Sequence, residues 1–249
     1  MHIRRISVCA AAALLTTTLV SAQEASTTIF ATYFRCNEAK EERADAIYKE
    51  TVAPILEKQV KAGRLLTYGW SRHWMGGEWR RLEYMTGKDM NVMVEARDAY
   101  IDELIKQNAA AAEEFSAICP SHDDYVWTPG ASSQAPEAVG RNRPAVGATT
   151  YFQCDSREDE ADAIVKTAFA PVMNQQVKDG KIGSWVWLRH LLGGKYRRAL
   201  VVDGASHAAM LSFWSGLAPA LDAAQPQLSR RFTEICSSHS DYIWDLSSK

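Results

Sequence analysis

The same pattern of residues occurs twice in this chain, and this repeat limits the possible folds more than any other feature. From residue 44 onward each shared segment returns 117 residues later, so the two copies align without a gap. A repeat of this length predicts two structural units of one fold, joined in tandem. The shared segments include Tyr33-Phe34 with Tyr151-Phe152, Ala44-Asp45-Ala46-Ile47 with Ala161-Asp162-Ala163-Ile164, and Ile118-Cys119 with Ile235-Cys236.

Each copy also predicts the same order of secondary structure. Residues 29–35 alternate and are rich in aromatic and β-branched side chains, which is typical of a strand. A helix follows to about residue 62, and Pro54 inside it (Pro171 in the second copy) predicts a kink or a new helical segment. The remaining elements are a hairpin, a second helical region capped by Asp89 or Ser206, and a short strand at 123–128 or 241–245.

The hairpin is the clearest local signal in each copy. Gly76-Gly77 and Gly193-Gly194 separate alternating segments, and a type I′ turn needs positive φ at both central residues. With these glycines as turn residues, Arg72 faces Arg81 and His73 faces Arg80. Because side chains alternate between the two faces of a strand, one face carries an arginine and tryptophan set. In the first copy this set is Trp70, Arg72, Trp74, Trp79 and Arg81.

The element order β-α-β-β-α-β is that of the ferredoxin-like split βαβ unit. In that topology the end of strand one lies beside the start of strand four. The order therefore predicts the disulfides Cys36–Cys119 and Cys154–Cys236 among the three possible pairings. Four free buried thiols are the alternative interpretation.

The first 22 residues have the features of a secretory signal peptide. Arg4 and Arg5 form a basic start, an apolar core runs to about Val20, and Val20-Ser21-Ala22 is a small-residue cleavage site. Its removal leaves 26 Lys and Arg residues against 30 Asp and Glu residues, a formal charge of −4. With no basic run, nucleic-acid binding is not expected, and no later stretch reaches membrane-spanning length. We expect an exported chain, periplasmic or secreted, with no membrane contact after cleavage.

Two ferredoxin-like units fused in tandem resemble the dimeric α+β barrel superfamily, in which two such sheets face each other and close a barrel. Its members include antibiotic-biosynthesis monooxygenases, EthD-like and NIPSNAP-like proteins, and haem-handling enzymes. The resemblance implies an α+β fold and a monomer that acts as a pseudo-dimer. It rests on topology and duplication, so no site residue is carried over from it. The expected division is a leader at 1–22, units at 23–128 and 148–249, and a linker at 129–147.

The opposed arginines are the first candidate site. Like charges across a strand pair are unfavourable, so their occurrence in both copies indicates a negative partner. One hypothesis is an anionic ligand that accepts bidentate hydrogen bonds from the guanidinium groups and stacks on a tryptophan. The alternative is structural, with the arginines paired to helix carboxylates such as Asp45 and Asp162. The candidate ligand-binding residues are Trp70, Arg72, Arg81, Trp187, Arg189 and Arg198.

The histidines are the second candidate. His73 and His190 lie in the hairpins, and His122 and His239 precede the last strands. They could act as general bases or as a metal or haem ligand set, but no spacing typical of a metal site occurs. We therefore expect no metal and no cofactor, with His73 and His190 as the candidate catalytic bases.

The leading functional hypothesis is binding of a small anionic or aromatic molecule between the two units. The eight tryptophans and nine tyrosines fit either a packed barrel core or an aromatic cage. The alternatives are a cofactor-independent monooxygenase-like enzyme with a histidine base, or an envelope or stress-related interaction protein without pocket chemistry. Whether the protein is an enzyme stays open at this stage.

Overall fold

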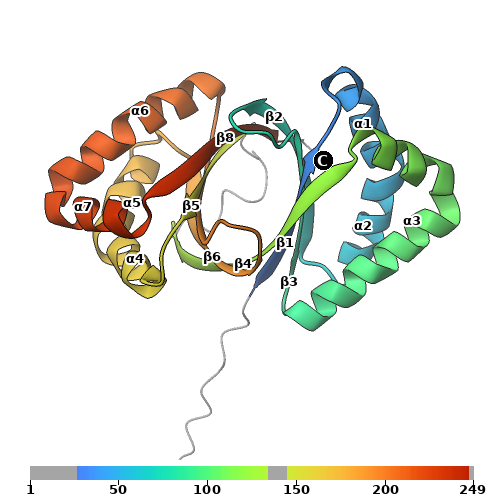
Figure 1. The fold of residues 1–249 in the computed structure, drawn as a ribbon, viewed down its shortest axis with the longest axis horizontal. Helices are drawn as coiled ribbons and strands as arrows, with labels where there is room; N and C mark the ends of the chain where they lie inside the picture. Colours follow the sequence, from blue (N-terminus) through green and yellow to red (C-terminus); the bar gives the residue numbers. More distant parts are fainter. Residues whose placement is uncertain (1–26, 134–144, 247–249) are drawn as a thin grey trace, which may run out of the picture.

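Eight antiparallel strands close into one barrel, and helices cover it on two opposite sides (Figure 1). The computed structural model describes residues 27–133 and 145–246. The expected leader peptide and residues 134–144 of the expected linker lie outside the described residues. The strand order around the barrel is β1-β3-β2-β8-β5-β7-β6-β4.

The N-terminal half (27–133) has the predicted order of elements. Its strands are β1 (Thr28–Arg35), β2 (Thr67–Met75), β3 (Arg81–Gly87) and β4 (Ser121–Ser132). Its helices are α1 (Glu41–Ile47), α2 (Ala53–Lys61) and α3 (Met90–Ile118), with a 3₁₀ turn η1 (Glu38–Lys40) and a π-helical turn η2 (Tyr48–Val52).

The C-terminal half (145–246) repeats this order. Its strands are β5 (Val146–Gln153), β6 (Ser184–Gly193), β7 (Arg198–Gly204) and β8 (Ser238–Leu246). Its helices are α4 (Glu158–Ile164), α5 (Ala170–Lys178), α6 (His207–Ala224) and α7 (Pro226–Ile235), with a π-helical turn η3 (Val165–Phe169). No helix within the two described ranges combines the length and apolar character needed to cross a membrane.

The sequence signals at the helix ends have the expected effect. Asp89 accepts a hydrogen bond from the Val92 amide at 2.9 Å. Ser206 caps α6 in the same way. Pro54 and Pro171 are the second residues of α2 and α5, and each of these helices follows directly on a π-helical turn. The predicted division of this helical region into two segments is confirmed.

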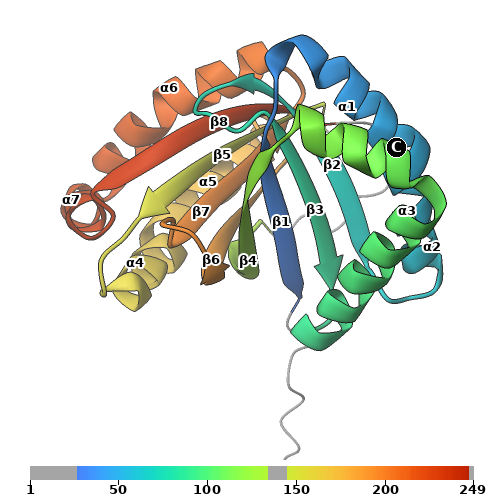
Figure 2. The same cartoon turned by 45° about the vertical axis from the view of Figure 1, so that its right-hand side comes forward.

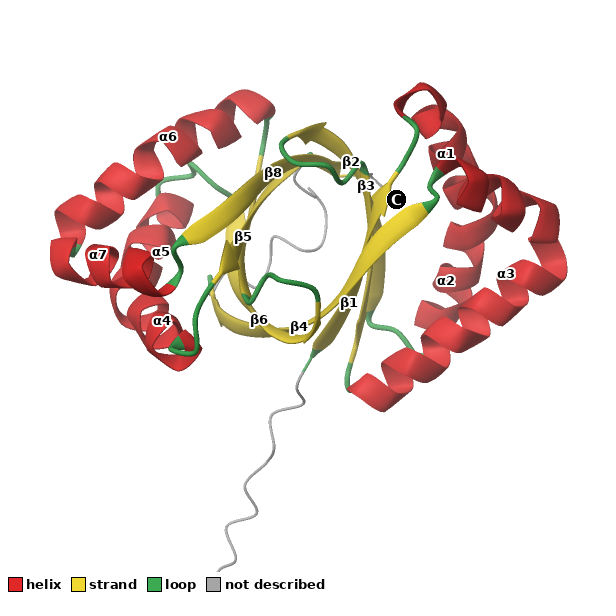
Figure 3. Cartoon of the chain, in the orientation of Figure 1, coloured by secondary structure: helices red, strands yellow, loops and turns green. Residues whose placement is uncertain are grey.

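The two halves close the barrel by pairing with each other. β2 pairs with β8 and β4 pairs with β6, so each half contributes both of its edge strands to the other. Figure 2 shows the strands of both halves as one continuous wall, and Figure 3 shows helices only on its outside. Closure leaves no exposed sheet edge and creates one shared interior.

Both disulfides form as predicted from the topology. Cys36 at the end of β1 is bonded to Cys119, and Cys154 at the end of β5 is bonded to Cys236. Each bridge fixes the end of the first strand of its half to the end of the last helix.

The hairpins keep the predicted register but not the predicted tip. Arg72 faces Arg81 in the β2–β3 pair. After one more hydrogen bond, from the His73 amide to the Arg80 carbonyl, the β2–β3 ladder ends. On its other edge β2 stays paired with β8 as far as Met75, which lies opposite Ile243. The tip folds over one end of the barrel, so Trp79 lies in the barrel core. The prediction that Trp79 shares a face with Trp70 is therefore wrong, because strand alternation stops where the ladder ends.

Candidate functional site

The buried arginine of each hairpin binds carboxylates of the first helix in its own half. In the N-terminal half Arg81 is 3% exposed, and its Nε and Nη2 donate to the two carboxylate oxygens of Asp45 at 2.6 and 2.8 Å. Its Nη1 donates to Glu41 at 3.0 Å. The Trp70 indole also donates to Asp45, at 2.8 Å. Burial by itself lowers the pKa of Arg81, but the bond to Asp45 and the nearby carboxylate charges hold this pKa above its ordinary value.

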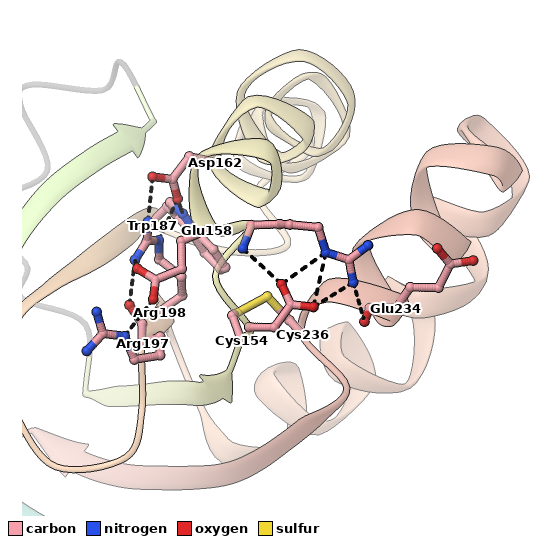
Figure 4. Close-up of a disulfide and its surroundings, with 10 residues drawn as sticks. Cys154, Glu158, Asp162, Trp187, Arg197, Arg198, Glu234 and Cys236 are labelled. Atoms are coloured by element: carbon pink, nitrogen blue, oxygen red, sulfur yellow. Dashed lines mark hydrogen bonds and ion pairs between the residues drawn. A yellow bond between two sulfur atoms is a disulfide. The ribbon is translucent and has the colours of Figure 1, made fainter.

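The C-terminal half contains the same arrangement (Figure 4). Arg198 donates to both oxygens of Asp162, at 2.6 and 2.9 Å, and to Glu158 at 2.6 Å. Trp187 donates to Asp162 at 2.7 Å. Figure 4 shows the Cys154–Cys236 disulfide close to this cluster, so two connections join the helices to the sheet in the same region.

The other two candidate arginines lie at the surface. The Arg72 side chain is 51% exposed and lies 3.8 Å from Asp245. Arg189 donates to the Pro129 carbonyl at 3.3 Å. The geometry thus gives the buried arginines partners within the chain, which is the structural alternative stated above. Anion binding by the six candidate residues stays a prediction.

The two hairpin histidines lie beside the barrel core. His73 Nδ1 accepts from Arg80 at 2.9 Å, and its Nε2 contacts the Gly76 carbonyl. His190 packs edge-on against Trp127 at 5.8 Å and lies near the Gly193 backbone, but neither ring nitrogen forms a hydrogen bond of normal geometry. Burial lowers the pKa of both imidazoles, so both are neutral near pH 7. Neither borders the cavity in the barrel described below.

The other two candidate histidines, His122 and His239, lie near the surface. His122 is 3.2 Å from Asp124, and His239 is 3.4 Å from Asp241. Within the described parts of the chain, no three His, Cys, Asp or Glu side chains are grouped so that they could hold a metal ion. A metal or haem ligand set built from these histidines gains no support from their positions.

The barrel interior is filled mainly by aromatic side chains from both halves. Tyr33 stacks on Trp79 with ring centres 4.3 Å apart, and Trp79 stacks on Tyr242 at 5.0 Å. The hairpin tips close this end: Trp79 donates to Asp123 at 2.7 Å, and Tyr196 of the other tip donates to Ser240 at 2.7 Å. The aromatic residues buried in this core are Tyr33, Trp79, Tyr125, Trp127, Tyr151, Tyr196, Tyr242 and Trp244.

A cavity of about 250 Å³ remains in the interior, away from the hairpin tips. Its walls are mostly apolar and include Ile29, Val201 and Leu246. Trp127 and Trp244, which occupy equivalent positions in β4 and β8, both border it, and neither buried indole N–H forms a hydrogen bond of normal geometry, although the Tyr33 hydroxyl lies near that of Trp127. We name this space the lumen cavity. A buried N–H left unpaired costs about 1–3 kcal/mol of stability. Two of them beside one cavity therefore lower stability unless a ligand pairs with them.

A carboxyl group also borders the lumen cavity. Asp203 accepts from Ser184 at 2.6 Å through one oxygen, while its other oxygen is buried without a partner. Burial raises the pKa of Asp203 above its ordinary value. No lysine, arginine or histidine side chain is among the described residues that line the cavity. Its chemistry therefore suits an uncharged aromatic guest better than an anion.

Two further cavities lie outside the barrel, one in each half between the sheet and the helices. The cavity in the N-terminal half has about 440 Å³ and is bordered by Glu83, Tyr48, Tyr100 and Arg97. Its counterpart in the C-terminal half has about 340 Å³. The sequence pattern did not indicate the group around Glu83, because the packing of helices against the sheet, and not the spacing of residues, brings it together.

Comparison with known proteins identifies the fold alone. No protein-family model matches the chain, and no curated protein sequence does. An anthrone oxidase-like protein is 14% identical with a TM-score of 0.60, over 92% of this chain and 94% of that one. A candidate monooxygenase from Lactobacillus acidophilus is 10% identical with a TM-score of 0.57, over 90% and 95%. A chlorite dismutase variant from Candidatus Nitrospira defluvii is 9% identical with a TM-score of 0.57, over 91% and 92%. The chain has the dimeric α+β barrel fold expected from its sequence.

Proposed function

We propose that this chain is an exported protein that binds a small, uncharged aromatic molecule in the lumen cavity between its two halves. The observation that carries the proposal is the pair of unpaired indole N–H groups on Trp127 and Trp244. Both tryptophans border one cavity with apolar walls. A flat guest with carbonyl or hydroxyl oxygens would accept from them and bury its rings against those walls.

The side chains that line the lumen cavity favour an uncharged aromatic ligand over the anionic ligand that the sequence also allowed. The buried Asp203 carboxyl, whose pKa is raised by burial, disfavours an anion and provides a further polar contact. The similarity to an anthrone oxidase-like protein is compatible with this ligand class, since an anthrone is an aromatic ketone. Export is the second part of the proposal and is supported by the sequence of residues 1–22 and by the two disulfides.

Calorimetric titration with 1,4-naphthoquinone tests the proposal, because this probe is a flat molecule with an aromatic ring fused to a quinone ring that carries two carbonyl acceptors. We expect the wild type to bind it more tightly than naphthalene, which lacks the acceptors. Trp127→Phe and Trp244→Phe should each weaken binding about fivefold, the effect of one hydrogen bond.

The matched control is Trp74→Phe, which changes a tryptophan on the hairpin surface that is 39% exposed. It should leave the affinity unchanged. Equal affinity of the wild type for the quinone and for naphthalene, or unchanged quinone affinity in both lumen variants, would contradict the proposal.

A further inference from the structure

The cavities between sheet and helices occupy the same place in the two halves but have different linings. The sheet row beneath the N-terminal cavity runs Trp70, Glu83, Thr32, Asp124 across four neighbouring strands. The equivalent row in the C-terminal half runs Trp187, Leu200, Thr150, Asp241. The two rows are identical except at one position, where Glu83 replaces a leucine.

Three positions opposite Glu83 differ in the same sense. Tyr48, Arg97 and Tyr100 border the N-terminal cavity, and the residues 117 positions later are Val165, Trp214 and Leu217. The C-terminal half thus fills this site with apolar and aromatic side chains, whereas the N-terminal half places a carboxyl, two phenols and a guanidinium there. We name this N-terminal cavity the acidic cleft.

Glu83 is buried in the acidic cleft and has no close cation. It is 5% exposed, and no lysine, arginine or histidine of the described residues forms an ion pair with it. The Tyr100 hydroxyl bonds to it from α3, and Arg97 acts on it only through its charge. Burial raises the pKa of Glu83 to about 7, and the charge of Asp124 adds to this. Near neutral pH the group is therefore divided between its two protonation states.

Tyr48, which borders the same cleft, has a buried hydroxyl without a partner. Its ring stacks on Trp70 with centres 4.2 Å apart and planes 17° apart, so the phenol is held in place. The residue is 5% exposed, and its hydroxyl has no hydrogen-bond partner. An orphaned hydroxyl and a buried carboxyl in one cavity both lower stability unless a ligand pairs with them.

We propose that the acidic cleft is a second ligand site, which takes a small hydrophobic molecule bearing a hydroxyl group. The ligand O–H donates to the Glu83 carboxylate, and its oxygen accepts from the Tyr48 hydroxyl. The rings or chain of the ligand contact the apolar wall formed by Phe34, Leu104 and Phe115. This site is separate from the lumen cavity and does not depend on it, because none of its polar residues borders that cavity.

Titration with 1-naphthol, with naphthalene as the probe that lacks the hydroxyl, tests this site. We expect Glu83→Leu, which installs the residue found in the C-terminal half, to weaken 1-naphthol binding at least tenfold and to leave naphthalene binding unchanged or stronger. Tyr48→Phe should weaken 1-naphthol binding about fivefold. Trp214→Leu alters only the C-terminal cavity and is the matched control, with wild-type affinity for 1-naphthol.

The pH dependence separates a direct role of Glu83 from a structural one. The groups that face Glu83 are Arg97 and Tyr100 on α3, Asp124 on β4 and Tyr48 on η2, while His122 pairs with Asp124 at the cleft border. Because the ionised carboxylate is the stronger acceptor, 1-naphthol affinity should rise as the pH increases through about 7. This rise should vanish in Glu83→Gln and persist in His122→Gln.

The isosteric glutamine variant keeps the test decisive if the leucine variant misfolds. Wild-type affinity for 1-naphthol in Glu83→Gln, with the rise across pH 7 retained, would overturn the proposal. That outcome would not affect the naphthoquinone titration of the Trp127 and Trp244 variants, so the two proposals are tested independently.

Discussion

Two buried arginines, Arg81 and Arg198, hold the first helix of each half against the sheet. Each forms bidentate hydrogen bonds to one aspartate, and each is only 3% exposed. Lysine cannot reproduce this geometry, because its ammonium group is a single point of contact. We predict that Arg81→Lys or Arg198→Lys lowers the free energy of unfolding by about 2–4 kcal/mol, since the aspartate is left without one of its bonds.

Urea denaturation measures this difference, and Arg72→Lys is its matched control. The Arg72 side chain is half exposed, so its substitution should change stability by less than about 0.5 kcal/mol. Equally small effects at all three positions would show that the buried arginine clusters contribute little to the free energy of unfolding.

Glu83 gives stability a pH dependence with a defined sign. Its pKa is about 7 in the folded chain against an ordinary value of 4.5, so the folded state keeps a proton that the unfolded state releases in this range. The stability contributed by this proton is fully present below pH 4.5 and is lost as the pH rises to 7. We predict that Glu83→Gln gains about 3 kcal/mol relative to the wild type between pH 4.5 and pH 8. Unfolding curves of the two proteins that stay parallel across this range would refute the assignment.

Residue patterns predicted part of this chemistry. The opposed Arg72 and Arg81 correctly indicated a nearby negative group, and the repeat gave the same conclusion twice. The acidic cleft could not be predicted in the same way. Tyr48, Arg97 and Tyr100 are separated along the chain and meet Glu83 only through helix packing, which the spacing of residues does not determine.

At the scale of elements, the hairpin tips differ most from the sequence prediction. A two-residue turn was expected, yet Gly76 and Gly77, with φ of 97° and 41°, lie in a longer tip that packs on the other half. The cause is long-range: β8 pairs along the other edge of β2 as far as Met75 and supplies partners that a local pattern cannot reveal. The register predicted from the same glycines is nevertheless correct.

Gly76 is the position where this close approach is most sensitive to substitution. A Cβ added there would lie 1.9 Å from the Asp241 carbonyl oxygen, whereas one added at Gly63, which has a similar positive φ of 71°, meets nothing within 4 Å. We predict that Gly63→Ala costs about 1 kcal/mol, from backbone strain alone, and that Gly76→Ala costs at least about 2 kcal/mol more.

The difference between the two glycine variants isolates the contact between the halves. Thermal unfolding followed by circular dichroism measures it. Similar midpoints for Gly63→Ala and Gly76→Ala would mean that the tip does not need to lie against β8.

For the whole molecule, the sequence predicted the architecture well, because duplication and element order leave few ways to satisfy four sheet edges. β2 with β8 and β4 with β6 satisfy all of them and create the shared interior. The difference between the two halves, and the sites that this difference creates, were harder to predict. A repeat shows what the copies share. The lumen cavity, however, depends on both halves together, and the acidic cleft depends on four positions, Glu83 among them, where the copies differ.

The central claim is that a ligand bound inside the barrel accepts hydrogen bonds from the indole N–H groups of Trp127 and Trp244. Proton–nitrogen correlation spectra of the ¹⁵N-labelled protein resolve the eight tryptophan indoles individually, and 1,4-naphthoquinone serves as the probe. We predict that the Trp127 and Trp244 signals move downfield on titration, whereas those of Trp70 and Trp187, already bonded to Asp45 and Asp162, stay in place. Bound probe with unmoved Trp127 and Trp244 signals would contradict the account.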